Sequence, residues 1–170
     1  MTAPDVDVLL DSGETVPLRS LYADRKLVLV FLRHFGCVFC REQVGQLRVH
    51  PNLNVAFVSM ATPEQARDFK AKTRSPHPFV CDPERDLYEA FGLGKGELKQ
   101  MMNPRVFARG FGATLRGHFV GLPIGDPWQM PGVFAIEPDG EVSWEYRSVD
   151  MSDNPATKTL LKLAQTDSGK

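Results

Sequence analysis

A continuous apolar run that leads to two cysteines constrains the fold of this chain most. The run covers Leu27–Leu32, and Cys37 and Cys40 follow a few positions later. A strand buried on both faces has this composition, because helices cover both sides of its sheet. The sequence therefore predicts an interior strand that delivers two thiols to a strand-to-helix turn.

The spacing of the two cysteines predicts thiol–disulfide exchange. A helix that begins at this turn offers unpaired N–H groups and a positive dipole end, and both stabilise a thiolate. Two intervening residues let Cys37 and Cys40 face each other across the turn, so a disulfide can form and reopen with little backbone movement. We therefore predict that both cysteines are catalytic.

Zinc binding is the alternative use of this pair. Four ligands would require Cys81 together with His77 or His34. A zinc site usually groups its second ligand pair at short spacing, and residues 77–81 match that spacing poorly. We expect no metal site. Cys81 is expected to be a small buried residue, with a resolving or regulatory role as the minority interpretation.

Charged residues flank the cysteines. A nearby cation lowers the pKa of a thiol because it stabilises the charged form. Arg33 is the stronger candidate for this catalytic role, since it lies where the predicted strand meets the turn, whereas Arg41 can equally be a solvated helix residue. His34 could act as an acid or base for the leaving thiol, but a hydrogen-bonded loop histidine is the more common case.

Strand and helix patterns alternate through the first half of the chain. Asn54–Met60 and Phe79–Cys81 are expected strands. The first is followed by Thr62-Pro63-Glu64-Gln65, in which a threonine cap, a first-turn proline and a capping-box glutamine open a helix. The second is followed by Asp82-Pro83, which can cap another helix. The resulting order is βαβαβα.

Hairpins are expected before and after this unit. Turn residues join Val6–Leu10 to Glu14–Val16 and join Val133–Glu137 to Glu141–Arg147. A last helix opens at Asn154-Pro155. The pattern predicts an α/β fold with a mixed central sheet flanked by helices, an N-terminal hairpin and a helical or loop insertion around 93–131.

Length and composition set the expected domain organisation and compartment. A chain of 170 residues with 42% hydrophobic content fits one domain, with a frayed tail at 165–170. The net charge of −1 argues against nucleic acid and anionic membranes as partners. The N-terminus lacks the pattern of a secretory signal, and three cysteines are too few for a disulfide scaffold. A cytoplasmic protein is therefore expected.

Three segments carry a resemblance to known families: Phe31–Glu42, Asp82–Leu93 and Gly125–Phe134. Together with the order of elements, they resemble the thioredoxin-like fold. The finer pattern is similar to the peroxiredoxin-like proteins of the alkyl hydroperoxide reductase/thiol-specific antioxidant (AhpC/TSA) superfamily, in particular the branch related to prostamide/prostaglandin F synthase.

The resemblance implies two different orders of attack for the cysteines. In thioredoxins the first cysteine attacks and the second resolves the mixed disulfide, which carries over to Cys37 and Cys40. In peroxiredoxins the Pro-x-x-x-Thr-x-x-Cys motif places the peroxide-attacking cysteine on Cys40, with Cys37 in place of the threonine and Arg33 in place of the proline. The resemblance leaves the order open.

The resemblance also implies a site role for Pro131. Thioredoxin-like proteins keep a cis-proline opposite the active cysteine, where it exposes a backbone edge for an extended thiol substrate. A cis bond is far less costly before proline than elsewhere. We therefore predict a cis Met130-Pro131 bond packed against the Cys37–Cys40 turn.

The function expected from the sequence is a thiol-dependent oxidoreductase that reduces a peroxide or a disulfide and resolves the intermediate as the Cys37–Cys40 disulfide. Electrons would come from a small thiol or a dithiol reductant protein, with no bound cofactor, and a homodimer is a possible assembly. The alternative is a non-catalytic redox-sensing or binding protein that uses oxidation of the pair only as a switch.

Overall fold

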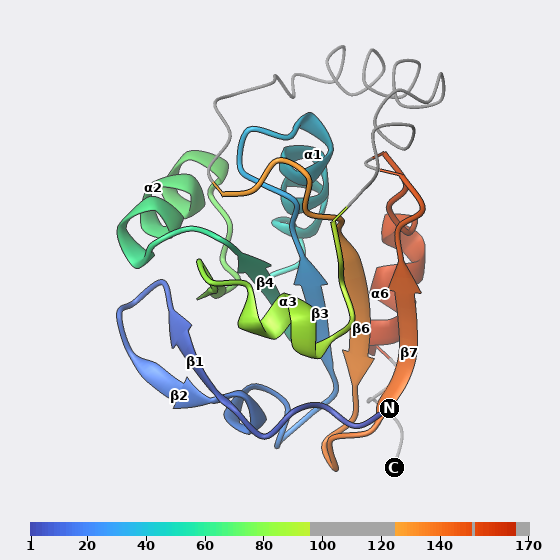
Figure 1. Ribbon diagram of the computed structural model, residues 1–170. Helices are drawn as coiled ribbons and strands as arrows, with labels where there is room; N and C mark the ends of the chain where they lie inside the picture. The colour runs from blue at the N-terminus through green and yellow to red at the C-terminus, as the bar shows by residue number, and fades with distance from the viewer. Residues whose placement is uncertain (96–124, 151, 166–170) are drawn as a thin grey trace.

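The strand that leads to the cysteines, β3 (Leu27–Phe31), is an interior strand of a seven-stranded mixed sheet (Figure 1). The computed structural model describes residues 1–95, 125–150 and 152–165. The sheet order is β2-β1-β5-β4-β3-β6-β7, with β3 parallel to β4 and antiparallel to β6. The other strands are β1 (Asp7–Leu10), β2 (Thr15–Pro17), β4 (Val55–Ser59), β5 (Phe79–Cys81), β6 (Gly132–Ile136) and β7 (Val142–Arg147).

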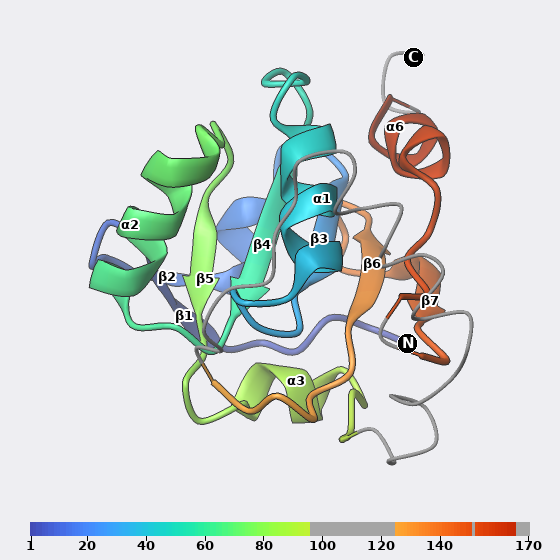
Figure 2. The ribbon, with the colours of Figure 1, turned by 90° about the horizontal axis from the view of Figure 1, so that it is seen from above.

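Helices cover both faces of this sheet. Figure 2 shows α1 (Val38–Leu47), α2 (Pro63–Thr73) and α6 (Thr157–Gln165) on one face, with α3 (Asp86–Ala90) on the other. The short 3-10 helix η1 (Leu18–Leu21) packs on the α3 side. None of the described helices has the length and apolar character needed to span a membrane.

The side chains of β3 explain why the strand is apolar throughout. Val28, Val30 and Leu32 enter the core under α1, α2 and α6. Leu27, Leu29 and Phe31 enter the second core, under α3 and η1. Successive side chains of a strand point to opposite faces, so a strand covered on both sides needs apolar residues at every position. The predicted interior strand and the mixed sheet between helices are confirmed.

The caps of two helices show how far local sequence determines their start. At α2 the predicted capping box is present, with reciprocal hydrogen bonds between Thr62 and Gln65. At α3 the cap is wider than predicted. The Asp82 carboxylate accepts hydrogen bonds from three consecutive backbone N–H groups, and Arg85 adopts a left-handed φ of 67° just before the helix. Asp82 therefore anchors α3 from the end of β5.

The two hairpins follow the prediction. β1 pairs with β2 and β6 pairs with β7, both antiparallel. Of the expected insertion around 93–131, residues 96–124 lie outside the described part of the chain, as does most of the expected tail, residues 166–170. The described ends of the insertion meet, because Lys95 forms a bridge with Gln129 immediately before β6.

Candidate functional site

Cys37 and Cys40 lie at the turn between β3 and α1. Cys37 is the N-cap residue of α1, in an extended conformation with φ −73° and ψ 123°, and Cys40 lies in the first helical turn. The Cys37 N–H donates to the His34 carbonyl at 3.1 Å, which closes the turn. Both cysteines are unbridged, with exposed fractions of 5% and 3%. The sequence-predicted location of the pair is confirmed.

The local environment divides the pair into an acidic and a non-acidic thiol. The pKa of Cys37 falls to about 6, mainly because the Cys40 side chain donates a hydrogen bond to it. Burial raises this pKa, whereas the charge of Arg33 and the backbone N–H groups of Phe39 and Cys40 lower it further. The same hydrogen bond, burial and the charge on Cys37 raise the pKa of Cys40. The reduced pair therefore holds its negative charge on Cys37 and its proton on Cys40.

Cys40 is held by the backbone that follows β3. The Arg33 N–H donates to Cys40 Sγ at 3.2 Å. This contact and the N–H of His34 favour the thiolate form of Cys40, although they do not outweigh the opposing effects. Cys40 can thus deprotonate more readily once Cys37 no longer carries charge.

Arg33 supplies the positive charge of the site. Only 5% of this residue is exposed, and Nη1 lies 2.8 Å from His34 Nε2. Nη2 donates to the Pro127 carbonyl, so the guanidinium joins the turn to the segment before β6. The structure therefore brings the predicted Arg33 next to the cysteines, where its charge lowers the pKa of Cys37.

His34 supports Arg33 as a neutral side chain. Burial and the adjacent Arg33 lower the pKa of His34 to about 4. With Nε2 accepting from the guanidinium, the proton of the neutral ring is assigned to Nδ1, which has no hydrogen-bond partner in the described structure. His34 therefore does not carry the charge needed to protonate a leaving group near neutral pH.

Arg41 contacts the outside of the turn. Its Nε donates to the Phe35 carbonyl at 2.8 Å, and its guanidinium carbon lies 5.9 Å from the centre of the Phe69 ring. The rings of Phe35 and Phe69 stack with their centres 4.0 Å apart. Arg41 thus braces the turn that presents the cysteines.

The predicted cis Met130-Pro131 bond is wrong. The residues that the structure describes contain no cis peptide, so this bond is trans. The backbone edge is also occupied: the Met130 N–H donates to the Gly94 carbonyl at 3.2 Å, and the Pro131 carbonyl accepts from Ser148 at 3.3 Å. Because residues 93–95 pair with this segment, Pro131 does not present the free edge on which its predicted site role depended.

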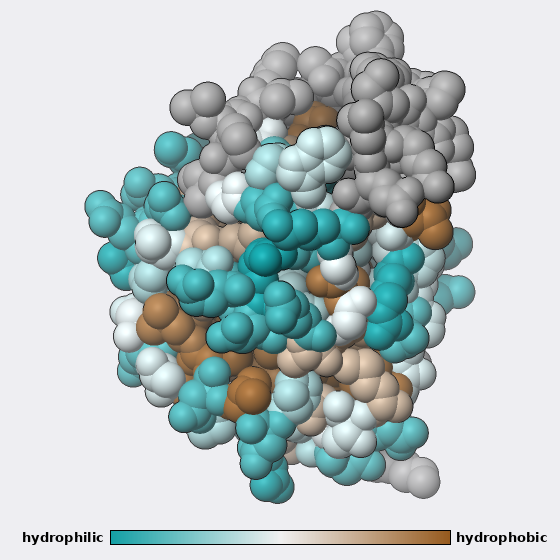
Figure 3. Space-filling view, in the orientation of Figure 1, coloured by the Kyte–Doolittle hydropathy of each residue, from teal (hydrophilic) through white to brown (hydrophobic). Residues whose placement is uncertain are grey.

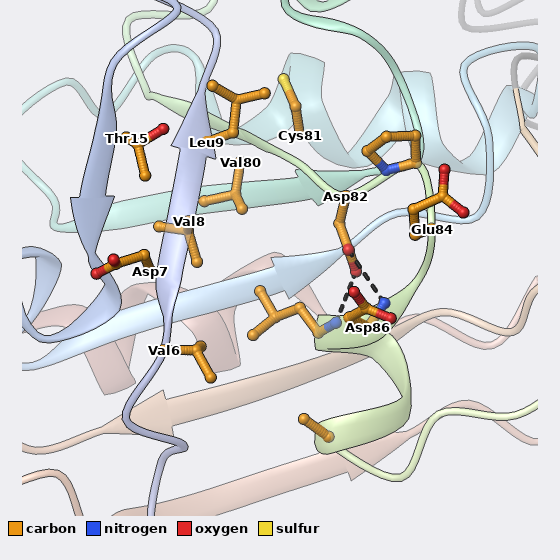
Figure 4. A pocket seen from close by; sticks show the side chains of 13 residues that line it. Val6, Asp7, Val8, Leu9, Thr15, Val80, Cys81, Asp82, Glu84 and Asp86 are labelled. Carbon is orange, nitrogen blue, oxygen red and sulfur yellow. Dashed lines mark hydrogen bonds between the residues drawn. The ribbon is translucent and has the colours of Figure 1, made fainter.

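Cys81 lines a separate pocket of about 440 Å³ between β1, β5 and the start of α3 (Figure 4). Neither Cys37 nor Cys40 lines it. Burial is the main reason that the pKa of Cys81 rises to about 11, which keeps this thiol protonated and unreactive near neutral pH. Figure 3 shows apolar surface around β1, among hydrophilic neighbours.

The zinc alternative finds no support in the described residues. They contain no group of three or more histidine, cysteine, aspartate or glutamate side chains that could hold a metal ion. His77 instead places Nε2 3.1 Å from the Leu47 carbonyl, in the core.

The sequence interpretation missed one residue next to the site, Tyr88. Its hydroxyl lies 2.6 Å from the Leu32 carbonyl at the end of β3. A tyrosine at a fully buried helix position needs a hydrogen-bond partner, which is the signal that could have identified it.

A family model described as AhpC/TSA antioxidant enzyme matches residues 41–150, beginning immediately after Cys40. Peroxiredoxin-like 2C of Homo sapiens is 25% identical over 174 residues, covering 94% of this chain and 77% of the relative. Prostamide/prostaglandin F synthase of Salmo salar is 32% identical over 87 residues, covering 48% of this chain and 44% of the relative.

Solved peroxiredoxin structures have the same fold. Peroxidoxin BcpB from Mycobacterium tuberculosis superimposes with a TM-score of 0.68 at 18% identity, covering 96% of this chain and 94% of the other. A peroxiredoxin Q of Xanthomonas campestris superimposes with a TM-score of 0.67 at 18% identity, covering 97% of this chain and 92% of the other. These similarities confirm the thioredoxin-like fold that the sequence predicted.

Proposed function

Because the chain belongs to the AhpC/TSA antioxidant enzyme family, we propose that it reduces peroxides with Cys37 as nucleophile and Cys40 as resolving thiol. The family carries thiol-dependent, peroxidase-like chemistry in general. The observation that supports this division of roles is the unequal acidity of the pair: the pKa of Cys37 is lowered to about 6 while that of Cys40 is raised.

The first step is attack of the Cys37 thiolate on one oxygen of the peroxide. The S–O bond forms as the O–O bond breaks, so the sulfur is oxidised to a sulfenic acid and the peroxide is reduced to an alkoxide, or to hydroxide from hydrogen peroxide. The Cys40 S–H, which is hydrogen-bonded to Cys37, supplies the proton that converts the leaving group to an alcohol or water. Arg33 stabilises negative charge at this stage.

The second step is attack of the Cys40 thiolate on the sulfenic sulfur of Cys37. A disulfide forms, hydroxide leaves and solvent protonates it to water. The Cys40 sulfur needs to move little to attack Cys37, because Cys37 caps α1 and Cys40 lies in the first turn of the same helix. An external thiol or dithiol reductant then supplies two electrons and restores both thiols.

Reduction of a protein disulfide is the less supported activity. An extended protein substrate would need a free backbone edge beside the cysteines, and both Met130 and Pro131 already hydrogen-bond within the chain. A small peroxide has no such requirement.

The test is peroxide consumption in the presence of dithiothreitol. We expect Cys37→Ser to lower turnover at least about 100-fold, because the nucleophile is lost. Cys40→Ser should complete one reduction and then slow, because the internal disulfide cannot form. The matched control, Cys81→Ser, should retain turnover.

Two results would contradict the proposal. Turnover that survives Cys37→Ser but not Cys40→Ser would assign the attack to Cys40. Absent turnover in the unmodified chain, together with an oxidation-dependent change of shape, would support the redox-sensing alternative.

A further inference from the structure

Tyr88 lies in the core beneath the cysteine turn. Its ring is fully buried and packs edge-on against Phe31, with ring centres 5.0 Å apart. Its hydroxyl lies 2.6 Å from the Leu32 carbonyl and 3.0 Å from the Val58 carbonyl. The hydroxyl has a single proton, and the shorter distance assigns it mainly to Leu32.

The same peptide group connects Tyr88 to Cys40. The Leu32 carbonyl and the Arg33 N–H belong to one peptide unit, and that N–H donates to Cys40 Sγ at 3.2 Å. The resulting chain runs from the Tyr88 hydroxyl through this peptide to the sulfur. A hydrogen bond to the carbonyl polarises the peptide and strengthens donation by its N–H.

The peptide before the connecting one, Phe31–Leu32, is held in place by the sheet. The last paired position of β3 and β4 joins Phe31 to Val58, and the Leu32 N–H donates to the Val58 carbonyl at 2.9 Å. The Tyr88 hydroxyl then lies between the carbonyls of Leu32 and Val58. The Leu32–Arg33 peptide that reaches Cys40 therefore follows directly on a peptide bonded to β4, and its own carbonyl is bound by Tyr88.

Two features keep the Tyr88 hydroxyl in place and protonated. The Asp82 carboxylate accepts its backbone N–H at 3.2 Å, which fixes the start of α3. Burial is the main reason that the pKa of Tyr88 lies well above its ordinary value, followed by Cys40 and Asp82. The phenol consequently keeps its proton while the cysteines titrate.

We propose that Tyr88 is a positioning residue that tunes Cys40 through the Leu32–Arg33 peptide. This proposal rests on the proposed function in one respect, because it takes Cys40 as the resolving thiol. By strengthening the Arg33 N–H donor, Tyr88 stabilises the Cys40 thiolate that remains when the Cys40 proton moves to the leaving group, and so favours disulfide formation. In the described structure, the side chain of Cys37 and the backbone N–H groups of Arg33 and His34 act on the pKa of Cys40, and Cys40 in turn raises the pKa of Tyr88.

The test measures the pKa of Cys40 without any peroxide. In a Cys37→Ser background, the rate of alkylation by iodoacetamide is followed against pH by mass spectrometry of the tryptic peptide 34–41, which excludes Cys81. Adding Tyr88→Phe should raise the pKa of Cys40 by about half a unit, which lowers its alkylation rate below that pKa about threefold.

The matched control is Tyr22→Phe. It removes another buried tyrosine hydroxyl, near the β6–β7 turn at Gly140, and should leave the pKa of Cys40 unchanged. If Tyr88→Phe lowers the melting temperature but leaves the pKa of Cys40 unchanged, Tyr88 is only structural and the proposal is overturned.

A second variant tests the proposal if Tyr88→Phe does not fold. 3-Fluorotyrosine at position 88 keeps the shape of the side chain and has a more acidic phenol, so it should lower the pKa of Cys40. An unchanged pKa would again overturn the proposal. Since neither measurement uses peroxide, a chain that fails to reduce peroxides could still show this effect, and the two proposals fail separately.

Discussion

At the scale of single residues, the site depends on where one negative charge resides. Cys37 and Cys40 are both buried, so each would resist ionisation alone. The hydrogen bond between them lets one thiolate form, with Cys40 as donor and Cys37 as acceptor. Ionisation of the pair is therefore governed first by Cys37.

The first prediction concerns the pH dependence of Cys37. The thiolate reacts and the thiol does not, so alkylation of Cys37 should rise with pH, with an apparent midpoint of about 6, and level off above it. An unperturbed cysteine would have its midpoint at about 8.5. Alkylation measured on the peptide 34–41 of the Cys40→Ser variant should show a higher midpoint, because the main hydrogen-bond donor is lost.

The second prediction concerns Arg33. Replacing it with glutamine removes the positive charge that favours the Cys37 thiolate, and should raise the pKa of Cys37 by about one unit. Alkylation at pH 5 should then fall about tenfold. Arg41→Gln is the matched control, because Arg41 contacts Phe35 and Phe69 instead. An equal shift in both variants would show that the effect of Arg33 is not specific.

At the scale of elements, α3 is short and depends on its cap. It has five residues, too few to be stable alone, and begins after a residue in the left-handed region. Three backbone N–H groups at its start donate to Asp82. The cap matters to the site because α3 carries Tyr88 under the end of β3.

The third prediction tests this cap. Asp82→Ala should lower the free energy of unfolding by about 2 kcal/mol, because three backbone N–H groups, two of them in part-buried hydrogen bonds, lose their acceptor. Urea unfolding measures the change. Asp86→Ala is the control: it removes a carboxylate from the same helix at an exposed position and should have an effect of about 0.5 kcal/mol or less.

The elements also show what the sequence could and could not predict. The apolar pattern of β3 identified a two-sided strand, and Thr62 with Gln65 identified the start of α2, because these signals are local. The pairing of Met130 with Gly94 was missed, since the two residues lie far apart in the sequence. The role of Tyr88 was missed for the same reason.

At the scale of the whole molecule, the segment before β6 connects the residues that follow α3 to the site. Gln129 is fully buried, and its amide nitrogen lies within 3.2 Å of the carbonyls of Leu93, Gly94 and Met130. The Pro127 carbonyl accepts from Arg33. The position of this segment thus affects the charge beside the cysteines.

The fourth prediction tests that connection. Gln129→Leu leaves buried carbonyls without a donor and should lower the free energy of unfolding by about 2 kcal/mol. It should also raise the pKa of Cys37, because Arg33 loses a fixed partner at Pro127. Trp128→Leu is the control, since 39% of that side chain is exposed. If Gln129→Leu lowers the stability but leaves the pKa of Cys37 unchanged, the segment before β6 does not act on the site.

The central claim is that Cys37 attacks and Cys40 resolves. The most direct measurement adds one equivalent of hydrogen peroxide to each single variant in the presence of a sulfenic acid trap and identifies the modified cysteine in peptide 34–41 by mass spectrometry. The account predicts a trapped Cys37 in Cys40→Ser and an unmodified Cys40 in Cys37→Ser. A trapped Cys40 in Cys37→Ser, with Cys37 unmodified in Cys40→Ser, would contradict it.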